Sequence, residues 1–299
     1  MSADVDTTAT TTSPRAAADA AAPRQHGLVR WWRRQSALLL TGYAVVLATA
    51  ALAFLVPLLA PEDAGRVDPG RAYLPPLSDG HLLGTDQIGR DMLLRVADGL
   101  RASLLISGSA VAAAICIGLL VGLVAGYYGG AVETVLMRLT DVQMALPFIV
   151  LAVMILSIAE PSYVSLTLVL CLAVWPAYAR AVRSSTRLEK DANYVQGIKI
   201  LGGSNLRVLR KYLLPAALAP LAVLAVLDVA ALILFEATLG FLGIGSPPDA
   251  PSLGSIMADG KQFITSAWWI SVIPGLVTFA AILGINLVGV ALRERKGQS

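Results

Sequence analysis

The chain has 299 residues, of which 56% are hydrophobic and only 14% are charged. A soluble domain carries about 25% charged residues, so this composition excludes an ordinary soluble protein and indicates a chain embedded in lipid. The net charge of +3 does not indicate nucleic-acid binding, because the excess lysines and arginines lie in segments beside apolar runs.

The first residues predict a tail. Residues 1–25 are rich in Thr, Ala and Pro, and Val5 is their one aliphatic residue larger than alanine. Such a segment cannot bury enough apolar surface to offset the entropy of ordering, and it has no apolar stretch typical of a cleavable signal peptide. The stretch HGLVRWWRRQ then places Trp31 and Trp32 among arginines, which suits the headgroup layer. We therefore expect residues 1–36 to form a disordered and amphipathic tail.

Long apolar runs predict the fold class. A membrane-spanning helix needs about 20 mainly apolar residues. Six segments meet this requirement, near 37–60, 103–127, 134–158, 162–180, 216–242 and 270–292. The expected fold is all-α, a polytopic membrane protein with six transmembrane helices. The segment 162–180 is the weakest of the six, because it is short and contains Trp175-Pro176.

The connecting segments predict the orientation. With a cytoplasmic N-terminus, sixteen lysines and arginines lie inside and six lie outside. This asymmetry favours cytoplasmic N- and C-termini. Residues 61–102 then form an extracytoplasmic segment, residues 103–292 a core of five spans, and residues 293–299 a cytoplasmic end.

Small residues recur every fourth position in the second predicted span. They are Ala110, Ala114, Gly118, Gly122 and Gly126. This spacing places them on one stripe of a helix, where a second backbone can approach closely. The stripe predicts tight helix packing, within the chain or against another subunit.

Two acidic residues, Asp228 and Glu236, lie within the fifth predicted span. An acid near the bilayer centre costs roughly 2.5–3.5 kcal/mol, so both side chains should face protein or a water-filled cavity. Two interpretations stay open: the acids line a translocation path, or they form interhelical hydrogen bonds.

The sequence contains no constellation typical of catalysis. His26 and His81 have no acids or cysteines at ligand spacing, and Cys116 and Cys171 lie singly within apolar runs. No GxxxxGK[ST] motif is present, so the chain is not expected to bind a nucleotide itself. We expect no catalytic site, no metal site and no cofactor, and any energy for work must come from an ion gradient or another subunit.

A basic amphipathic segment, residues 191–214, interrupts the apolar pattern, and we call it the elbow. Two short helices are predicted, broken at Gly202-Gly203, with Tyr194, Ile198 and Leu201 on one face of the first. In the second, Ser204 or Asn205 can cap the start, while Leu206, Leu209 and Leu213 lie opposite Arg207 and Lys211, and Pro215 is expected to end it. The residues alone leave two roles open, a membrane-surface helix held by anionic lipid or a docking element for a soluble protein.

The elbow resembles the permease loop of bacterial ABC importers. In that family a Glu-Ala-Ala triplet, a later glycine and a Leu-Pro pair form the coupling helix that enters a groove on the ATPase subunit. The matching positions are Gly202 for the glycine and Leu214-Pro215 for the Leu-Pro pair, whereas Gln196-Gly197-Ile198 replaces the triplet. The missing glutamate implies that docking depends on shape, on Tyr194 and on basic residues such as Arg207.

Further segments resemble the C-type permease of dipeptide, oligopeptide and nickel importers. They are HLLGTDQIGRDMLLRVADGLRASL, DVQMALPFIVLA, WPAYARAVR and EATLGFLGIGSPPDAPSLGSIMADGKQFITSAWWISVIPGL. Val290 and Leu253 depart from the residues usual in the family. The resemblance implies a type I importer fold, a B-type permease partner in a heterodimer, two ATPase subunits that bind the ATP, an extracytoplasmic substrate-binding protein, and a place in the bacterial inner membrane.

Three alternatives to peptide uptake follow. A nickel, metallophore or opine importer uses the same kind of subunit. An ion-coupled secondary transporter would use Asp228 and Glu236 as carriers, yet no internal repeat typical of that class is evident. An intramembrane enzyme would need a nucleophile–base pair or an HExxH motif, and the sequence has neither.

Overall fold

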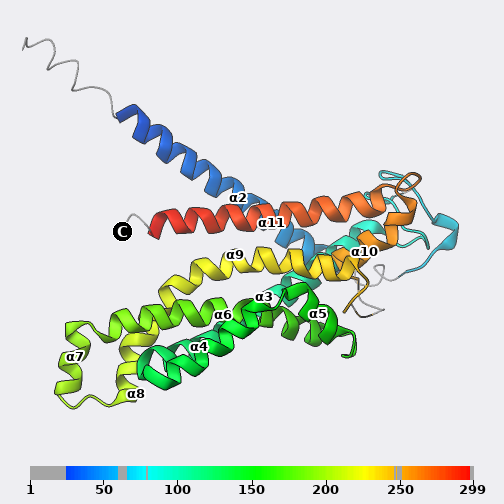
Figure 1. Ribbon diagram of the computed structural model, residues 1–299. Helices are drawn as coiled ribbons and strands as arrows, with labels where there is room; N and C mark the ends of the chain where they lie inside the picture. The colour runs from blue at the N-terminus through cyan, green and yellow to red at the C-terminus, as the bar shows by residue number, and fades with distance from the viewer. Residues whose placement is uncertain (1–24, 60–65, 79, 246, 248–250, 297–299) are drawn as a thin grey trace, which may run out of the picture.

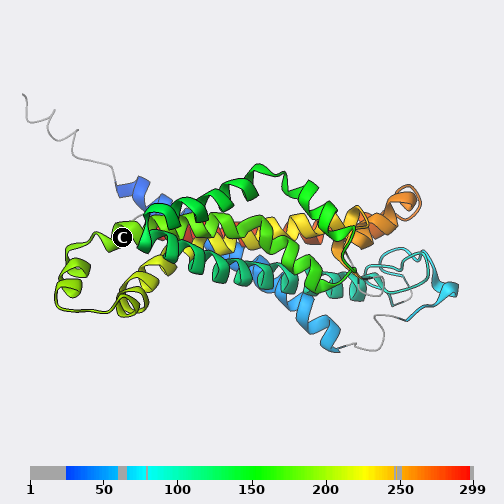
Figure 2. The same ribbon diagram turned by 60° about the horizontal axis from the view of Figure 1, so that its bottom comes forward.

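The computed structural model describes residues 25–59, 66–78, 80–245, 247 and 251–296. The described chain is an elongated helical bundle (Figures 1 and 2). Its long helices are α2 (Gln25–Leu59), α3 (Met92–Tyr128), α6 (Tyr163–Lys190), α9 (Leu214–Phe241) and α11 (Trp269–Lys296). All five contain a stretch long and apolar enough to cross a membrane. The predicted all-α, polytopic fold is confirmed.

The shorter helices lie at the two ends and along one side of the bundle. They are α4 (Gly130–Ala145), α5 (Phe148–Leu156), α7 (Asn193–Ile200), α8 (Asn205–Val208) and α10 (Leu253–Gly260), with the 3-10 turns η1 (Pro69–Arg71) and η3 (Lys261–Phe263). Helices α7 and α8 lie at one end, while α10 and residues 66–91 lie at the other (Figures 1 and 2). The described start of α2 and the end of α11 lie at the same end as α7 and α8.

Several predicted boundaries are wrong. Helix α2 begins at Gln25 and not near 37, so the amphipathic residues 26–36 are its first turns; residues 1–24, where the disordered tail is predicted, lie outside the described part. Once the apolar span is helical, extending the helix backward costs little, because each added residue gains a hydrogen bond. Helix α3 likewise begins at Met92 and not near 103, capped by the Asp91 carboxylate, which accepts hydrogen bonds from the Leu93 and Leu94 amides.

The third predicted span, 134–158, is broken. Helices α4 and α5 meet at an angle of 86° and count as one span only if taken together. The break falls at Leu146-Pro147, where Leu146 has an extended backbone. A proline disfavours the helical conformation of the residue before it, which accounts for the bend.

The predicted weak point at Trp175-Pro176 is not a break. Helix α6 continues through Pro176, which is buried. Proline cannot donate a hydrogen bond to the carbonyl four residues earlier, which here belongs to Leu172. The Gln143 side-chain amide of α4 donates to that carbonyl at 3.5 Å. A neighbouring helix thus supplies a partner for the carbonyl that the proline leaves free.

The stripe of small residues in α3 packs within the chain, against α6. A Cβ atom added at Gly118 would lie 2.4 Å from the Cβ of Tyr178, and one at Gly122 would lie 2.5 Å from the Ala179 carbonyl. Ala110 and Ala114 are fully buried in the same core. Of the two possibilities that the stripe left open, the structure shows close packing inside the subunit.

Two apolar cores fill the bundle. One joins α3, α5, α6 and α9, and the other joins α2, α3, α10 and α11. The second core continues into residues 66–78 and 80–91 and into α10, which together we call the cap. Arg95 of α3 is buried beneath the cap and forms ion pairs with Asp86 at 2.7 Å and Asp259 at 3.2 Å. The indole of Trp269 donates to the Thr85 carbonyl at 3.0 Å.

Candidate functional site

The elbow projects beyond the long helices at one end of the bundle (Figures 1 and 2). It consists of α7, α8 and η2 (Leu209–Leu213), a π-helical turn that leads into α9. The two predicted helices and the break between them are therefore present. The elbow is joined covalently to two long helices, α6 before it and α9 after it.

A small core fixes the elbow to the end of α3. Val195, Val208 and Leu213 are fully buried against Tyr127, the penultimate residue of α3. The Tyr127 hydroxyl donates to the Asn205 side-chain carbonyl at 2.5 Å. The Lys199 ammonium lies 4.8 Å from the centre of the Tyr127 ring, within the range of a cation–π contact.

Lys190, the last residue of α6, strengthens the same attachment. Its ammonium donates to the Tyr127 backbone carbonyl at 2.7 Å, which satisfies an acceptor at the end of α3. The elbow, α3 and α6 are thus connected by apolar, aromatic and charged contacts. A force applied to α7 or α8 would be transmitted to two long helices.

The turn between the elbow helices is a Schellman motif. The Gly203 amide donates to the Ile198 carbonyl at 2.9 Å, and the Gly202 amide donates to the Lys199 carbonyl at 3.1 Å. Gly202 has a φ of +82°, the left-handed conformation that this motif requires. Ser204 then caps α8 by accepting a hydrogen bond from the Arg207 amide.

The two glycines of the turn differ in their surroundings. A Cβ atom at Gly202 would meet no atom within 4 Å, whereas one at Gly203 would lie 2.6 Å from Ile198 Cγ2 and 2.8 Å from the Ile198 carbonyl oxygen. The requirement at Gly202 is therefore one of backbone conformation, and the requirement at Gly203 is one of space.

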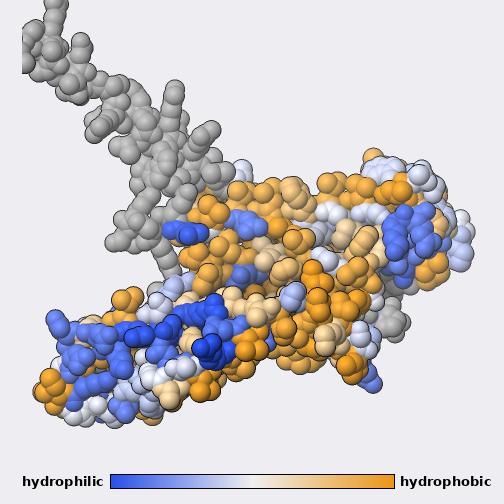
Figure 3. Space-filling view, in the orientation of Figure 1, coloured by the Kyte–Doolittle hydropathy of each residue, from blue (hydrophilic) through white to orange (hydrophobic). Residues whose placement is uncertain are grey.

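The outward face of the elbow carries exposed apolar side chains. Ile200 is 86% exposed and Leu201 is 88% exposed, and Tyr194 and Leu206 are exposed beside them. In the space-filling view an orange patch stands at the tip of this otherwise mainly blue end (Figure 3). A cluster of exposed large apolar side chains among polar ones is typical of an interaction surface.

The predicted apolar faces of the elbow are only partly correct. Leu213 and half-buried Ile198 and Leu209 do pack inward, but Tyr194, Leu201 and Leu206 point outward. Val195 and Val208 are the residues that bury instead. Helices this short have only one or two residues per face, so the bend of the chain, and not helical periodicity, decides which residues are covered.

The predicted end of the second helix at Pro215 is also wrong. The chain stays helical from Asn205 through Pro215, which occupies the first turn of α9. A proline there removes no intrahelical donor that the turn needs. The wider π turn of η2, in which the Leu214 amide donates to the Leu209 carbonyl, joins the two segments.

The structure separates the predicted coupling residues into two groups. The first group lies on α7, the turn and α8: Tyr194, Gln196, Gly197, Ile198, Gly202 and Arg207. Leu214 and Pro215 lie at the start of α9, on the far side of the π turn. Sequence reasoning did not single out Tyr127 or Lys190, and it considered Asn205 only as a possible cap. The contacts of these residues join segments distant in the chain, which no local pattern contains.

The two acidic residues of α9 lie far from the elbow and differ from each other. Glu236 is 1% exposed, and it accepts a hydrogen bond from Ser103 of α3 at 2.6 Å. Ser252, the N-cap of α10, also interacts with this carboxylate. Asp228 is half-buried, and no hydrogen bond joins it to another side chain in the described part of the chain. Glu236 therefore connects α9 to α3, whereas Asp228 has no such connection among the described residues.

The chain is similar to known membrane transport proteins. Residues 118–297 match the family model described as "binding-protein-dependent transport system inner membrane component". Among curated relatives, the dipeptide transport system permease protein DppC of Haemophilus influenzae is 37% identical over 260 residues, which cover 85% of this chain and 88% of the relative. The probable D,D-dipeptide transport system permease protein DdpC of Escherichia coli is 31% identical, with 88% of each chain covered. The glutathione transport system permease protein GsiD of Pectobacterium atrosepticum is also 31% identical, with 88% of each chain covered.

Proposed function

The chain belongs to the family of binding-protein-dependent transport system inner membrane components, and from that membership we propose that it is a permease subunit of an ATP-driven peptide importer. Two ATPase subunits, a second, B-type permease and an extracytoplasmic binding protein complete the proposed assembly. The work of this chain is mechanical, because the fuel is bound and hydrolysed by the ATPases.

The exposed apolar tip of the elbow is the observation that carries this proposal. Ile200 and Leu201 lie at the basic end of the described chain (Figure 3), and both side chains are more than four-fifths exposed there. An ATPase groove that received these side chains would bury them, which stabilises the contact by about 25 cal/mol per Å² of apolar surface. Exposed Arg207 beside them can pair with acidic residues of the groove.

The attachment of the elbow explains how docking leads to movement. The fully buried cluster of Val195, Val208 and Leu213 on Tyr127 ties the elbow to α3, and Lys190 ties it to α6. When ATP binding moves the ATPases, a docked elbow moves with them and carries these helices. In the proposal this motion opens and closes the path through the membrane.

Peptides are the proposed cargo because the relatives above carry peptide names. None of those names refers to nickel, so they do not support nickel uptake. In this proposal Glu236 has an interhelical bonding role, supported by the Ser103–Glu236 hydrogen bond of 2.6 Å, and neither it nor Asp228 carries a coupling ion. The elbow and both chain ends face the cytoplasm of a bacterial cell, in agreement with the excess of positive charge at that end.

A substitution at the tip tests the docking. Leu201→Asp places a charge at the centre of the proposed contact, and loss of a central apolar residue from an interface costs about 2 kcal/mol or more. We expect at least about a tenfold loss of ATPase subunits retained on the purified permease. ATP-dependent peptide uptake in proteoliposomes should fall with it.

Ile158→Asp is the matched control. Ile158 is 90% exposed, close to the 88% of Leu201, but it directly follows α5, which lies away from α7 and α8 (Figure 1). ATPase retention should be unchanged in this variant. Normal retention by Leu201→Asp, in a membrane protein that is correctly folded, would refute the proposed role of the elbow.

A further inference from the structure

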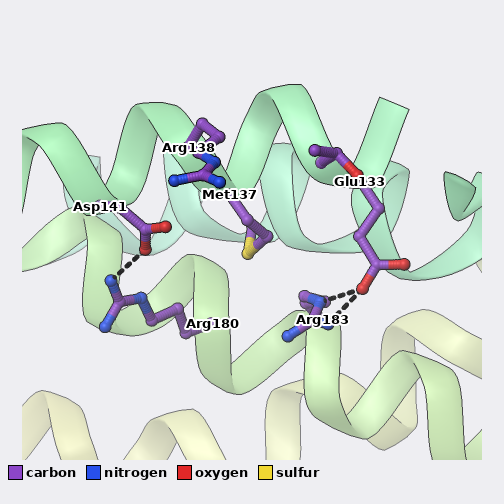
Figure 4. Close-up of a pocket in the computed structure, with 7 residues that line it drawn as sticks. Glu133, Met137, Arg138, Asp141, Arg180 and Arg183 are labelled. Atoms are coloured by element: carbon purple, nitrogen blue, oxygen red, sulfur yellow. Dashed lines mark hydrogen bonds and ion pairs between the residues drawn. The ribbon is translucent and has the colours of Figure 1, made fainter. Parts of the chain in front are cut away.

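A charged groove lies between α4 and α6 and is separate from the elbow tip. Its volume is about 520 Å³, and its charged lining residues are Glu133, Arg138, Asp141, Arg180 and Arg183 (Figure 4). The two helices are joined across it by ion pairs. Arg183 and Arg187 of α6 both bind Glu133 Oε1 of α4, the latter at 3.0 Å, and Arg180 donates to Asp141 Oδ1 at 2.7 Å.

Positive charge is in excess in this groove. Arg138 is exposed and has no hydrogen bond or ion pair with a described residue, and no dashed line reaches it in Figure 4. The second oxygens of Glu133 and Asp141 are also without a partner among the described residues, but each carboxylate already has an arginine on its first oxygen. With Arg187 beside the groove, four arginines stand against two carboxylates, so the groove attracts an anion.

A second hollow lies next to the groove along the same helices. Its volume is about 340 Å³, and its lining is mainly apolar, with Met144, Leu146 and Phe148 at the α4–α5 bend and Leu172 on α6. No charged side chain is present among the described residues that line it. Its polar member is Gln143, whose amide already donates to the Leu172 carbonyl. The two hollows therefore form one seam that is charged in one part and apolar in the other.

Both walls of the seam change from charged to apolar at the same level. In α6 the first charged residue is Arg180, and the helix is basic from there to its end at Lys190. In α4 and α5, which count as one span only when taken together, Asp141 is the last charged residue before Leu156. Figure 3 shows the blue surface of the elbow end extending over the start of α4 and giving way to orange toward α5. The charged groove thus lies at the level of the membrane surface, and the apolar hollow lies toward the membrane interior.

This order of surfaces matches a phospholipid. A guanidinium can bind a phosphate through two parallel hydrogen bonds, and basic pockets between membrane helices are typical sites for anionic headgroups. Arg138 and Met144 are separated by about 9 Å along α4, at 1.5 Å per residue, so an acyl chain of the same lipid can reach the hollow. One turn of a helix, about 10 Å across and 5.4 Å long, occupies roughly 400 Å³. A helix of another subunit could therefore fill this hollow only with a side chain, whereas an extended acyl chain is narrow enough to enter.

We propose that the α4–α6 seam binds an anionic phospholipid, with the phosphate on Arg138 and an acyl chain in the hollow at the α4–α5 bend. The inference goes beyond the proposed function, because it requires only that the chain lies in a membrane and is independent of the cargo. The lipid would cover a face of α4 that the described chain leaves open.

Photo-cross-linking tests this site in the complete permease–ATPase complex, held in nanodiscs of phosphatidylcholine. The probes are phosphatidylglycerol and phosphatidylcholine that carry the same diazirine group in one acyl chain. We expect phosphatidylglycerol to label residues 143–148 and 172–176, identified by mass spectrometry. Phosphatidylcholine should label them about fivefold less, because the excess of arginines repels its choline.

Substitutions of Arg138 assign the headgroup contact. Arg138→Gln should lower the labelling by phosphatidylglycerol about tenfold, as the loss of a charge-assisted hydrogen bond predicts, and Arg138→Lys should retain most of it. Arg138 has no partner to lose among the described residues, so both variants should keep the thermal unfolding midpoint of the unchanged protein. Arg293→Gln is the control, because Arg293 is also exposed near the elbow end but lies on α11 (Figure 1). Its labelling should be unchanged.

Four results would overturn the lipid site. They are equal labelling by the two probes, labelling confined to other segments, full labelling of Arg138→Gln, and labelling of the isolated chain but not of the complete complex. The last of these would assign the seam to a contact with another subunit. Displacement of the probe by inorganic phosphate, and not by potassium chloride of equal ionic strength, would likewise contradict the proposal and assign the groove to a soluble anion.

Discussion

The two ends of the bundle differ in which side chains they bury and which they leave exposed. At the cap end, Asp86 is fully buried and accepts hydrogen bonds from the Ile88 and Arg90 amides and from both the Arg90 and Arg95 side chains. At the elbow end, Ile200 and Leu201 are left almost completely exposed. The cap thus pairs its buried charges, Asp86 and Arg95, internally, whereas the elbow leaves apolar surface exposed.

This difference indicates where rigidity is built into the subunit. A buried ion pair whose remaining hydrogen bonds are satisfied holds one geometry, because any rearrangement leaves a charge without a partner. The elbow core contains only four fully or nearly buried apolar residues, so its stability on its own is small. Docking of an ATPase would add buried apolar contacts that this small core does not provide.

The largest effect is expected at the cap. Asp86→Ala leaves the guanidinium of Arg95, itself 5% exposed, with Asp259 as its one remaining acidic partner among the described residues. Breaking a buried pair in this way costs about 3–5 kcal/mol. The variant should show a lower thermal unfolding midpoint in detergent and a lower level in membranes.

Asp259→Asn is the control for the cap. The Asp259 side chain is 41% exposed, and this change leaves the buried pair of Arg95 with Asp86 intact, so we expect a loss of about 1 kcal/mol or less. Its unfolding midpoint should lie close to that of the unchanged protein. Equal unfolding midpoints for Asp86→Ala and the unchanged protein would show that the cap is not the rigid end.

A second, intermediate effect is expected at the elbow turn. Gly203→Val brings a Cβ atom within 2.6 Å of Ile198 Cγ2 and would break the Schellman motif. The bundle should remain folded, while ATP-dependent uptake falls by about tenfold, because the tip is no longer presented correctly.

Gly202→Asn is the matched variant. It must adopt a φ near +82° but meets no atom within 4 Å, and asparagine visits this conformation at a cost of about 1 kcal/mol or less. Uptake should therefore change little. If uptake fell further in Gly202→Asn than in Gly203→Val, the backbone conformation of the turn, and not the space beside it, would determine the geometry of the elbow.

The smallest effect is expected from Tyr127→Phe. The change removes the hydroxyl that donates to Asn205 at 2.5 Å but keeps the ring and its contact with Lys199. A single neutral hydrogen bond contributes about 1 kcal/mol. Amide hydrogen exchange in α7 and α8 should accelerate by about fivefold, measured by mass spectrometry, with no change in the cap. An acceleration of similar size in residues 66–91 would show that the two ends are coupled.

The long apolar runs made five of the spans predictable. Their length and composition are local properties, and lipid requires a helix wherever such a run crosses it. The break in the elbow was predictable for a similar reason, since Gly202-Gly203 supplies the left-handed residue that a helix end requires.

The position of the bend within the spans was not predictable from a proline alone. Both Pro147 and Pro176 occur in apolar runs, yet only Leu146-Pro147 separates two helices. At Pro176 the Leu172 carbonyl, freed by the proline, accepts from Gln143 of another helix. A contact of that kind depends on the packing of α4 against α6, which no local pattern contains.

The sequence by itself determined that the chain is helical, that it enters the membrane several times and that a basic elbow interrupts it, because these follow from composition and from short-range spacing. Only the tertiary structure decided that Val195 and Val208 turn inward while Leu201 and Leu206 stay exposed, and that Arg95 meets Asp86 and Asp259. Each of these depends on residues distant in the chain being brought together, and the free energy of such contacts exists only once the helices have packed.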